Sequence, residues 1–245
     1  MPARAHAPTH TNSVEHFTVI EAEFVARPNR FLAVVRIGGE IVWAFVPNPG
    51  RMDELLTPGA TVLLRPRPNH KRKTSVDLAA VRHDGVIVSL DSNLPNRFVR
   101  QLLSEHRLPL VPPYSSFKSE PPAYGGRFDF LLHGSAGHTF IEVKSSTLVV
   151  DRTAMFPDAV TSRGARHVRY LVRALKDGTV DSAFVVFVVQ RPDADAFSPN
   201  AETDPEFAGA LRYAVSQGVQ VIPLLTRLVL PQWTLELIRV LPLVM

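Results

Sequence analysis

Cysteine is absent from this chain of 245 residues. Its absence excludes disulfide bonds, thiolate metal sites and cysteine nucleophiles, and it suits the reducing cytoplasm. No apolar run approaches the roughly 18 residues that span a membrane, and the first residues lack the apolar core of a signal peptide. The sequence therefore predicts a cytoplasmic protein that does not associate with a membrane.

Several catalytic motifs are missing as well. The sequence contains no glycine-rich phosphate loop, no His-Glu-x-x-His and no Gly-x-Ser-x-Gly, and its histidines are scattered without the spacing of metal ligands. The protein classes that these motifs define are not supported. The chain has a moderate excess of positive charge, with 27 Lys and Arg against 23 Asp and Glu and a net charge of +4. This excess favours polyanionic partners, of which nucleic acid is the first candidate.

The N-terminal part of the chain has the pattern of a small β-barrel. We expect residues 1–16 to be disordered and residues 17–90 to form an OB-like barrel. Short apolar strands with turn signals at Gly38-Gly39 and Asp84-Gly85 support this assignment. Spacing alone does not separate an OB-like barrel from an SH3-like one.

Residues 91–245 alternate between strands and helices, which predicts an α/β (α+β) domain with a central mixed sheet. We expect residues 91–108 to form a connecting helix and the proline-rich residues 108–124 to be irregular. The segment 183–190 is apolar on both faces, as a buried central strand should be. Further helices are predicted at 159–177 and 205–217.

Acidic groups and a lysine converge in the segment 127–144. A tight hairpin with its tip between Ser135 and Ala136 places Asp129 directly opposite Glu142, and the period of two adds Lys144 to the same face. Opposed carboxylates repel and are best tolerated with a cation between them. We therefore predict a divalent metal here, Mg²⁺ or Mn²⁺. The polar outer face of an ordinary amphipathic hairpin would show the same residues, and this alternative stays open.

The order Asp129, Glu142-x-Lys144 resembles the core of the PD-(D/E)xK nuclease superfamily. In such a site the carboxylates are hard oxygen ligands for Mg²⁺, and the lysine orients or deprotonates the attacking water. On its own, this short motif is not specific.

Longer strings carry a more specific resemblance. Residues 114–120 read YSSFKSE, residues 156–167 read FPDAVTSRGARH, and residues 47–52 read PNPGRM. With further strings at 93–97 and 197–199, these follow the order and spacing of the sugar fermentation stimulation protein (SfsA) family. The resemblance covers residues 17–225.

This resemblance implies an OB-like domain joined to a nuclease-like domain, with DNA binding as the usual activity. It makes Asp129, Glu142 and Lys144 the candidate metal and catalytic set, and it adds Glu120 as a further acid near the metal. The chain departs from the family where Pro49 replaces a threonine and Arg51 occupies the variable position. Any role of that hydroxyl therefore does not transfer.

The helix expected at 159–177 carries an arginine face opposite its apolar stripe. This face is either a phosphate-binding ridge or an ordinary solvated surface. His167 lies between the two faces; it either touches a phosphate or has the structural role that we favour. For Asp158, just before the helix, we favour an N-cap over metal ligation. The four arginines are Arg163, Arg166, Arg169 and Arg173.

The run from His70 to Lys73 is the densest basic stretch, and it lies between two predicted barrel strands. We expect this loop to follow a nucleic-acid backbone, with a merely solvated loop as the alternative. Phe31, Trp43 and Phe45 either stack on bases or, in the interpretation we favour, fill the barrel. The predicted nucleic-acid contacts are Lys71, Arg72, Lys73, Arg51, Arg163, Arg166 and His167.

Together these features predict a two-domain DNA-binding protein with a Mg²⁺-dependent phosphodiesterase site. A non-catalytic DNA-binding regulator of sugar (maltose) metabolism genes is the main alternative. A barrel that docks another protein is a weaker one. DNA is the expected partner, with RNA and a homodimer left open.

Overall fold

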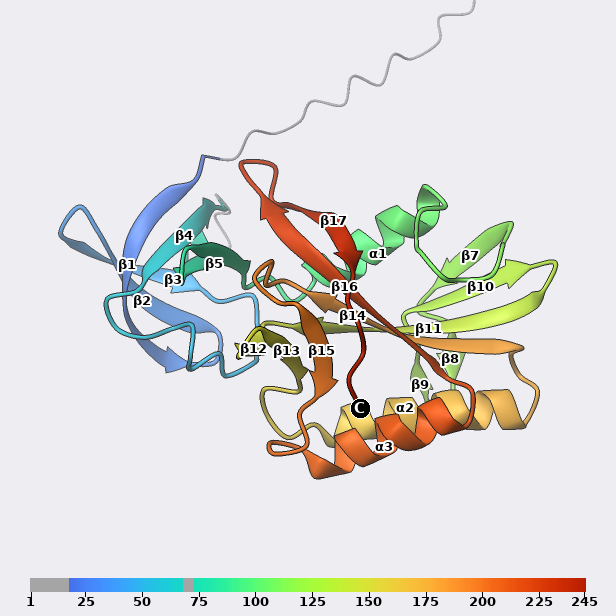
Figure 1. Ribbon diagram of the computed structural model, residues 1–245. Helices are drawn as coiled ribbons and strands as arrows, with labels where there is room; N and C mark the ends of the chain where they lie inside the picture. Colours follow the sequence, from blue (N-terminus) through green and yellow to red (C-terminus); the bar gives the residue numbers. More distant parts are fainter. Residues whose placement is uncertain (1–17, 68–72) are drawn as a thin grey trace, which may run out of the picture.

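The computed structural model describes residues 18–67 and 73–245. The first domain is a β-barrel, drawn in blue to cyan at the left of Figure 1. Its strands follow the order β3-β2-β1-β4-β5-β6, and a β3–β5 pairing at Phe45 and Asp77 closes the barrel. This is the OB-like architecture that the sequence predicts. The bounds are β1 Ile20–Asn29, β2 Leu32–Ile37, β3 Glu40–Phe45, β4 Thr61–Pro66, β5 Val76–His83 and β6 Val86–Ser89.

The second domain is built on a mixed six-stranded sheet in the order β17-β16-β14-β11-β10-β7. Strands β11, β14 and β16 run parallel, while β7, β10 and β17 pair antiparallel to their neighbours. The bounds are β7 Ser116–Ser119, β10 Phe130–Gly134, β11 Gly137–Ser146, β14 Ser182–Val189, β16 Gln220–Val229 and β17 Thr234–Val240. Short strands complete the domain: β8 Pro122–Ala123, β9 Gly126–Arg127, β12 Leu148–Val150, β13 Thr153–Phe156 and β15 Ala196–Pro199.

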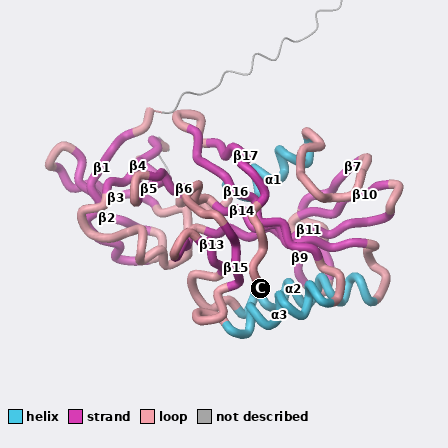
Figure 2. Tube along the Cα trace, in the orientation of Figure 1, coloured by secondary structure: helices cyan, strands magenta, loops and turns pink. Residues whose placement is uncertain are grey.

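Helices cover both faces of this sheet. Helices α2 (Ser162–Lys176) and α3 (Pro205–Ser216) pack on one face, and α1 (Leu94–Ser104) packs on the other, as Figures 1 and 2 show. In β14, Val185 and Phe187 face α2 and α3, whereas Phe184 and Val186 face α1. The predicted central strand is therefore confirmed, and its burial on both sides explains its continuous apolar sequence. No helix among the described residues is long and apolar enough to cross a membrane.

The two domains share a small apolar interface. Leu63, Ala79 and Ala80 of the barrel form one cluster with Trp233, which lies in the turn between β16 and β17. The guanidinium of Arg65 lies 5.6 Å from the centre of the Trp233 ring. Apolar contact and a buried cation thus fix the barrel against the edge of the central sheet.

Three local expectations are wrong. The proline-rich segment is not wholly irregular, because Ser116–Ser119 pairs with β10 as an edge strand. Asp158 is not the N-cap of α2: the helix starts at Ser162, and the Thr161 hydroxyl accepts the Gly164 amide at 3.0 Å. Trp43 and Phe31 do not fill the barrel, because they are 48% and 46% exposed while Ala44 beside Trp43 is fully buried.

Candidate functional site

The hairpin of β10 and β11 has the predicted register. Phe130 pairs with Ile141 and Gly134 with Gly137, so Ser135 and Ala136 form the turn. The ladder ends at the Phe130–Ile141 pair, one residue short of Asp129 and Glu142. Asp129 thus stands just outside the paired strand, where its side chain rather than its backbone meets β11.

The Asp129 carboxylate is held by two donors. The backbone amide of Val143 donates to Oδ2 at 2.7 Å, and the Asn96 side chain of α1 donates to Oδ1 at 2.6 Å. Burial, followed by the charge of Glu142, raises the pKa of Asp129 above its usual range, although these donors and Lys144 offset part of the effect. Asp129 is therefore fixed in position and lies within the electrostatic reach of both other members of the predicted set.

Glu142 is the most enclosed acid of the site, with 3% of its surface exposed. Its Oε1 accepts the Lys144 ammonium and the Nδ1 of His167, the latter at 2.6 Å. Burial acts to raise the pKa of Glu142, but Lys144 and His167 together outweigh burial and lower it. The carboxylate is thus ionised at neutral pH. Its other oxygen, Oε2, is buried and has no hydrogen-bond partner.

His167 reaches Glu142 from α2. The Nε of Arg163, one turn earlier, donates to His167 Nε2 at 3.4 Å, so the ring accepts at Nε2 and donates at Nδ1 to the carboxylate. Through this hydrogen bond the ring orients the Glu142 carboxylate. The sequence placed His167 at the boundary of the two helix faces, and the buried position agrees with the structural role favoured there.

Glu120 is not gathered into this cluster. Its side chain is 68% exposed, and its carboxylate pairs with Arg127 at 3.2 Å. Its backbone amide does donate to the Asp129 carbonyl at 2.9 Å. Glu120 therefore positions the chain beside Asp129 without turning its carboxylate to the other acids.

Sequence reasoning missed Asn96 as a site residue and gave no partner for His167. Both belong to the strings that carry the family resemblance, 93–97 and 156–167, which was the available signal. Their contacts join α1 and α2 to the two acids from opposite faces of the sheet. No periodicity within one segment reveals a contact of this kind.

The donor set suits a hard divalent cation. Among the described residues no three His, Cys, Asp or Glu side chains form a cluster that would enclose a metal. Two neighbouring carboxylates, one with an unpartnered buried oxygen, are nevertheless what Mg²⁺ uses when waters and substrate phosphate complete its coordination. The residues present therefore fit such an ion.

The arginine face of α2 is exposed as predicted, but its members differ. Arg169 pairs with Glu206 at 2.9 Å, and Arg173 pairs with Asp177 at 3.8 Å. Arg166 forms no hydrogen bond or ion pair with any described residue, and Arg163 contacts only His167. The uncompensated positive charge of the arginine face is thus in the N-terminal half of α2.

The predicted basic contacts on the barrel are only partly described. Lys71 and Arg72 lie outside the described residues, while Lys73 is exposed in the loop between β4 and β5. Arg51 is exposed, and its carbonyl accepts a hydrogen bond from Arg27 at 2.5 Å.

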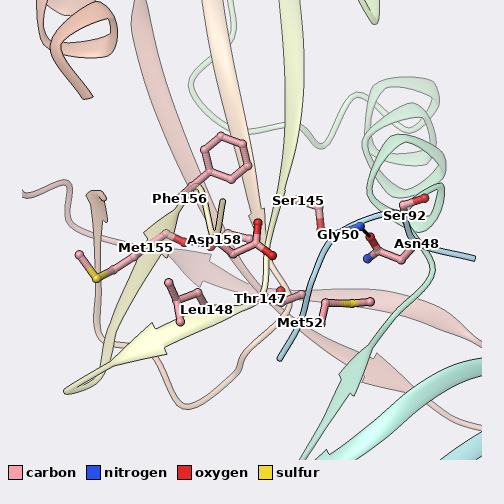
Figure 3. Close-up of a pocket in the computed structure, with 11 residues that line it drawn as sticks. Asn48, Gly50, Met52, Ser92, Ser145, Thr147, Leu148, Met155, Phe156 and Asp158 are labelled. Atoms are coloured by element: carbon pink, nitrogen blue, oxygen red, sulfur yellow. Dashed lines mark hydrogen bonds between the residues drawn. The ribbon is translucent and has the colours of Figure 1, made fainter. Parts of the chain in front are cut away.

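A cavity of about 80 Å³ lies where the two domains meet. Figure 3 shows Asn48 and Gly50 of the barrel on one side and Ser145, Thr147 and Asp158 of the second domain on the other. The Gly50 amide donates to the Asn48 side chain at 2.8 Å, which shapes the loop at this boundary. The strings at 47–52 and 156–167 therefore meet across the domain boundary, beyond the end of β11.

Comparison with known proteins agrees with this two-part organisation. A family model described as the SfsA N-terminal OB domain matches residues 25–90, and one described as the sugar fermentation stimulation protein RE domain matches residues 93–230. A sugar fermentation stimulation protein homolog of Desulforamulus reducens is 44% identical over 84% of this chain and 85% of its own. One of Acetivibrio thermocellus is 40% identical over 92% of this chain and 97% of its own.

A solved structure is similar over nearly the whole chain. It is the structure of Pyrococcus furiosus SfsA in complex with Ca²⁺, which matches with a TM-score of 0.82 and 28% identity. The match covers 93% of this chain and 96% of that one. Two family models in series, full-length relatives and a shared fold lead to one conclusion: this chain belongs to the sugar fermentation stimulation protein family.

Proposed function

We propose that this chain binds nucleic acid, with DNA as the expected partner, and that its second domain cleaves phosphodiester bonds with the help of Mg²⁺ or Mn²⁺. One observation carries the proposal. The buried, ionised Glu142 has one oxygen held by Lys144 and His167 and the other oxygen buried without a partner. An unsatisfied carboxylate oxygen is costly unless a ligand completes it, and Asp129 adds a second carboxylate next to it.

A divalent cation is the ligand that this chemistry favours. Two carboxylates face a single lysine here, and both acids are largely removed from solvent. The Ca²⁺ named with the Pyrococcus furiosus relative supports a cation of this class, since Ca²⁺ and Mg²⁺ both take oxygen ligands. The chemistry that a bound Mg²⁺ supplies is polarisation of a phosphoryl oxygen and a lowered pKa of water.

The residues around the proposed cation would have separate roles. Asp129 and Glu142 provide the oxygen ligands, and Asn96 and His167 hold them in place. Lys144, with 15% of its side chain exposed, lies beside both acids, where its ammonium would orient the attacking water or its neutral amine would accept a proton from that water. This set of roles is that of a PD-(D/E)xK nuclease site.

Nucleic-acid binding is supported by unpaired cations outside this cluster. Arg163 and Arg166 lie in the first half of α2, Arg163 one turn before His167 and Arg166 directly before it. Arg51 and Lys73 are exposed on the barrel. Cations on both domains would neutralise phosphates along one bound strand, and binding would weaken with salt as counterions are released.

The test combines metal binding with cleavage. Calorimetric titration with Mn²⁺ and gel assays on single-stranded, duplex and branched DNA and on RNA are compared for the wild type, Glu142→Gln and a control. Glu202→Gln is the matched control, because Glu202 is exposed and has no hydrogen bond or ion pair among the described residues. We expect Glu142→Gln to lose both metal binding and cleavage, and the control to retain both.

The non-catalytic regulator makes the opposite prediction. Its wild type would cleave none of these substrates with any divalent metal and would bind DNA equally well in EDTA. That result would end the phosphodiesterase proposal and keep the DNA-binding one. Failure to bind any nucleic acid would end both.

A further inference from the structure

The outer surface of β2 and β3 carries an unusual set of side chains. Directly opposed residues of antiparallel strands share a face, and the pairs Leu32–Phe45 and Val34–Trp43 lie outside while Ala33–Ala44 lies inside. Two alanines fill the interior where the barrel narrows to its β3–β5 closure. The large residues of these strands are therefore turned outward. Phe31 is 46% exposed, Trp43 is 48% exposed and Ile41 is 54% exposed.

Exposed aromatic rings are otherwise rare in this protein. Among the Phe, Tyr and Trp residues that the structure describes, only Phe31, Trp43 and Tyr213 are exposed, and two of the three lie on this face. Single exposed apolar residues need no explanation, but a cluster with a tryptophan at its centre marks a binding surface.

The rings are held in place before any ligand binds. Phe31 and Phe45 lie with ring centres 6.3 Å apart and planes inclined by 9°. The carbonyl of Phe31 accepts the Val46 amide at 3.0 Å, and its own amide donates to the Asn29 side chain at 2.9 Å. Parallel, anchored rings lose little conformational entropy on binding.

Positive charge gathers at one end of these rings. The guanidinium of Arg27 donates to the carbonyls of Arg30 and Arg51 at 2.7 and 2.5 Å, and so ties the β1–β2 turn to the following loop. Arg30 and Arg51 are thereby brought to the same end of the barrel. Both are exposed, and neither pairs with a carboxylate among the described residues. The Arg30 guanidinium lies 6.0 Å from the Phe31 ring centre.

We infer that this face, centred on Phe31, Trp43 and Phe45, binds the unpaired bases of a single-stranded nucleic acid, with its phosphates on Arg30 and Arg51. The inference rests on the proposed function, because it names the strand state of the nucleic acid proposed there. Aromatic platforms flanked by cations bind single strands by base stacking and phosphate contact. In a barrel of this type, the β2–β3 face between the β1–β2 and β4–β5 loops is placed for such a ligand.

The observations disfavour other occupants. A duplex keeps its bases stacked on one another, so it offers no free base face to Trp43. A second copy of the chain would meet this face with the same face, as two-fold contacts require, and would offer no phosphate to Arg30 and Arg51. At the end of this face away from Arg30 and Arg51, the cation is Arg36, and its charge is already neutralised because it pairs with Glu23 at 2.7 Å.

Trp43 supplies a direct spectroscopic readout. The chain has two tryptophans, and Trp233 is 5% exposed and packed between the domains, so ligand quenching reports on Trp43. The full-length protein in EDTA is titrated with a mixed-sequence DNA 12-mer, its duplex form, and an abasic 12-mer that has the phosphates without the bases. We expect the single strand to quench Trp43 fluorescence and to bind more tightly than the duplex. The abasic strand should bind weakly and leave the fluorescence unchanged.

Variants measured by fluorescence anisotropy assign the contact. Trp43→Ala should weaken single-strand binding roughly 10- to 100-fold. Trp43→Phe should retain most of the affinity, because it keeps an aromatic face. Tyr213→Ala is the matched control, since Tyr213 is 49% exposed on α3, and its affinity should not change. Arg30→Ala should reduce the slope of log K against log salt by roughly 0.7.

The outcomes separate this inference from the proposed function. Binding of nucleic acid that Trp43→Ala leaves intact and Arg166→Ala weakens would overturn the platform while retaining DNA binding. Absence of binding to every nucleic acid would remove both. A wild-type dimer that Trp43→Ala converts to a monomer in sedimentation would assign the face to a second copy and overturn the inference.

Discussion

Two groups of buried charges in this protein have opposite balances. At the barrel, Asp77 and Asp91 are 4% and 5% exposed and pair with three arginines among the described residues. In the second domain, Asp129 and Glu142 are met by a single lysine and by the ring of His167. The three arginines are Arg65 and Arg67 of the barrel and Arg97 of α1.

The difference in charge balance distinguishes a cluster with a structural role from the proposed metal site. Both oxygens of Asp91 are engaged, Oδ1 by the Asn93 amide and Oδ2 by Arg65 and Arg97, and these contacts join the barrel to α1. Glu142 keeps one buried oxygen without a partner, and the pKa of Asp129 is raised. A cluster built only for stability has no reason to leave negative charge uncompensated. The proposed cation would bind at the deficit in the second domain.

Lys144→Met gives the largest contrast between the two clusters. We expect cleavage to fall by about 10²- to 10⁴-fold, because the lysine acts on the attacking water. Metal binding should persist, since both carboxylates remain and Glu142 Oε1 loses a competing cation. Single-turnover cleavage and Mn²⁺ titration measure the two effects. Equal loss of both would mean that Lys144 serves only to hold Glu142.

Asp91→Asn tests the structural cluster. The change leaves Arg65, only 5% exposed, with one carboxylate fewer, and we expect the free energy of unfolding to fall by roughly 3 kcal/mol. Urea denaturation followed by circular dichroism measures the loss. Cleavage per folded molecule should be unchanged. A loss of cleavage in fully folded Asp91→Asn would show that the two clusters are not separable.

His167→Gln should have a smaller effect on the catalytic side. A glutamine can still donate to Glu142 Oε1, whereas His167→Ala removes the donor that orients this carboxylate. We expect His167→Ala to lose about 10- to 100-fold in metal affinity and cleavage, and His167→Gln to recover much of the loss. Titration with Mn²⁺ for both variants tests this order. Equal defects would assign His167 to packing alone.

The parts that the sequence predicted are those set by local pattern. The β10–β11 register followed from a tight turn and strict alternation, and the burial of β14 followed from its continuous apolar run. The family strings also predicted the order of the two domains. In each case the determining residues are neighbours in the chain.

The features that the sequence did not predict depend on contacts between segments that are distant in the chain. Alternation placed Trp43 and Phe45 on one face of β3 but did not say which face is inside, and barrel closure on β5 put the alanines there. Asp129 was expected to pair with β11 through its backbone. Instead, its side chain accepts a hydrogen bond from the Val143 amide just beyond the last strand pair. Asn96 and His167 reach the acids across the thickness of the sheet, which no single segment encodes.

The smallest expected effect is a difference in pH dependence between the clusters. For Asp91, burial opposes ionisation, but Arg97, Asn93 and Arg65 outweigh burial and lower the pKa in the folded protein. Its contribution to stability is therefore fully present above the unfolded pKa, about 3.9, and is lost as the pH falls through the lower folded value. Acidification should thus destabilise the wild type more steeply than Asp91→Asn.

For Asp129 the pH dependence of stability has the opposite sign, because burial and Glu142 raise its pKa in the folded protein. Without metal, ionised Asp129 costs stability above that raised pKa, and the cost disappears as the pH falls toward the unfolded value. As the pH falls from the folded pKa to the unfolded pKa, the wild type should gain stability relative to Asp129→Asn. The slope should be at most about 1.4 kcal/mol per pH unit. Urea unfolding in EDTA at a series of pH values measures both slopes. If the two variants deviate from the wild type in the same direction, the contrast between a compensated and an uncompensated cluster is wrong.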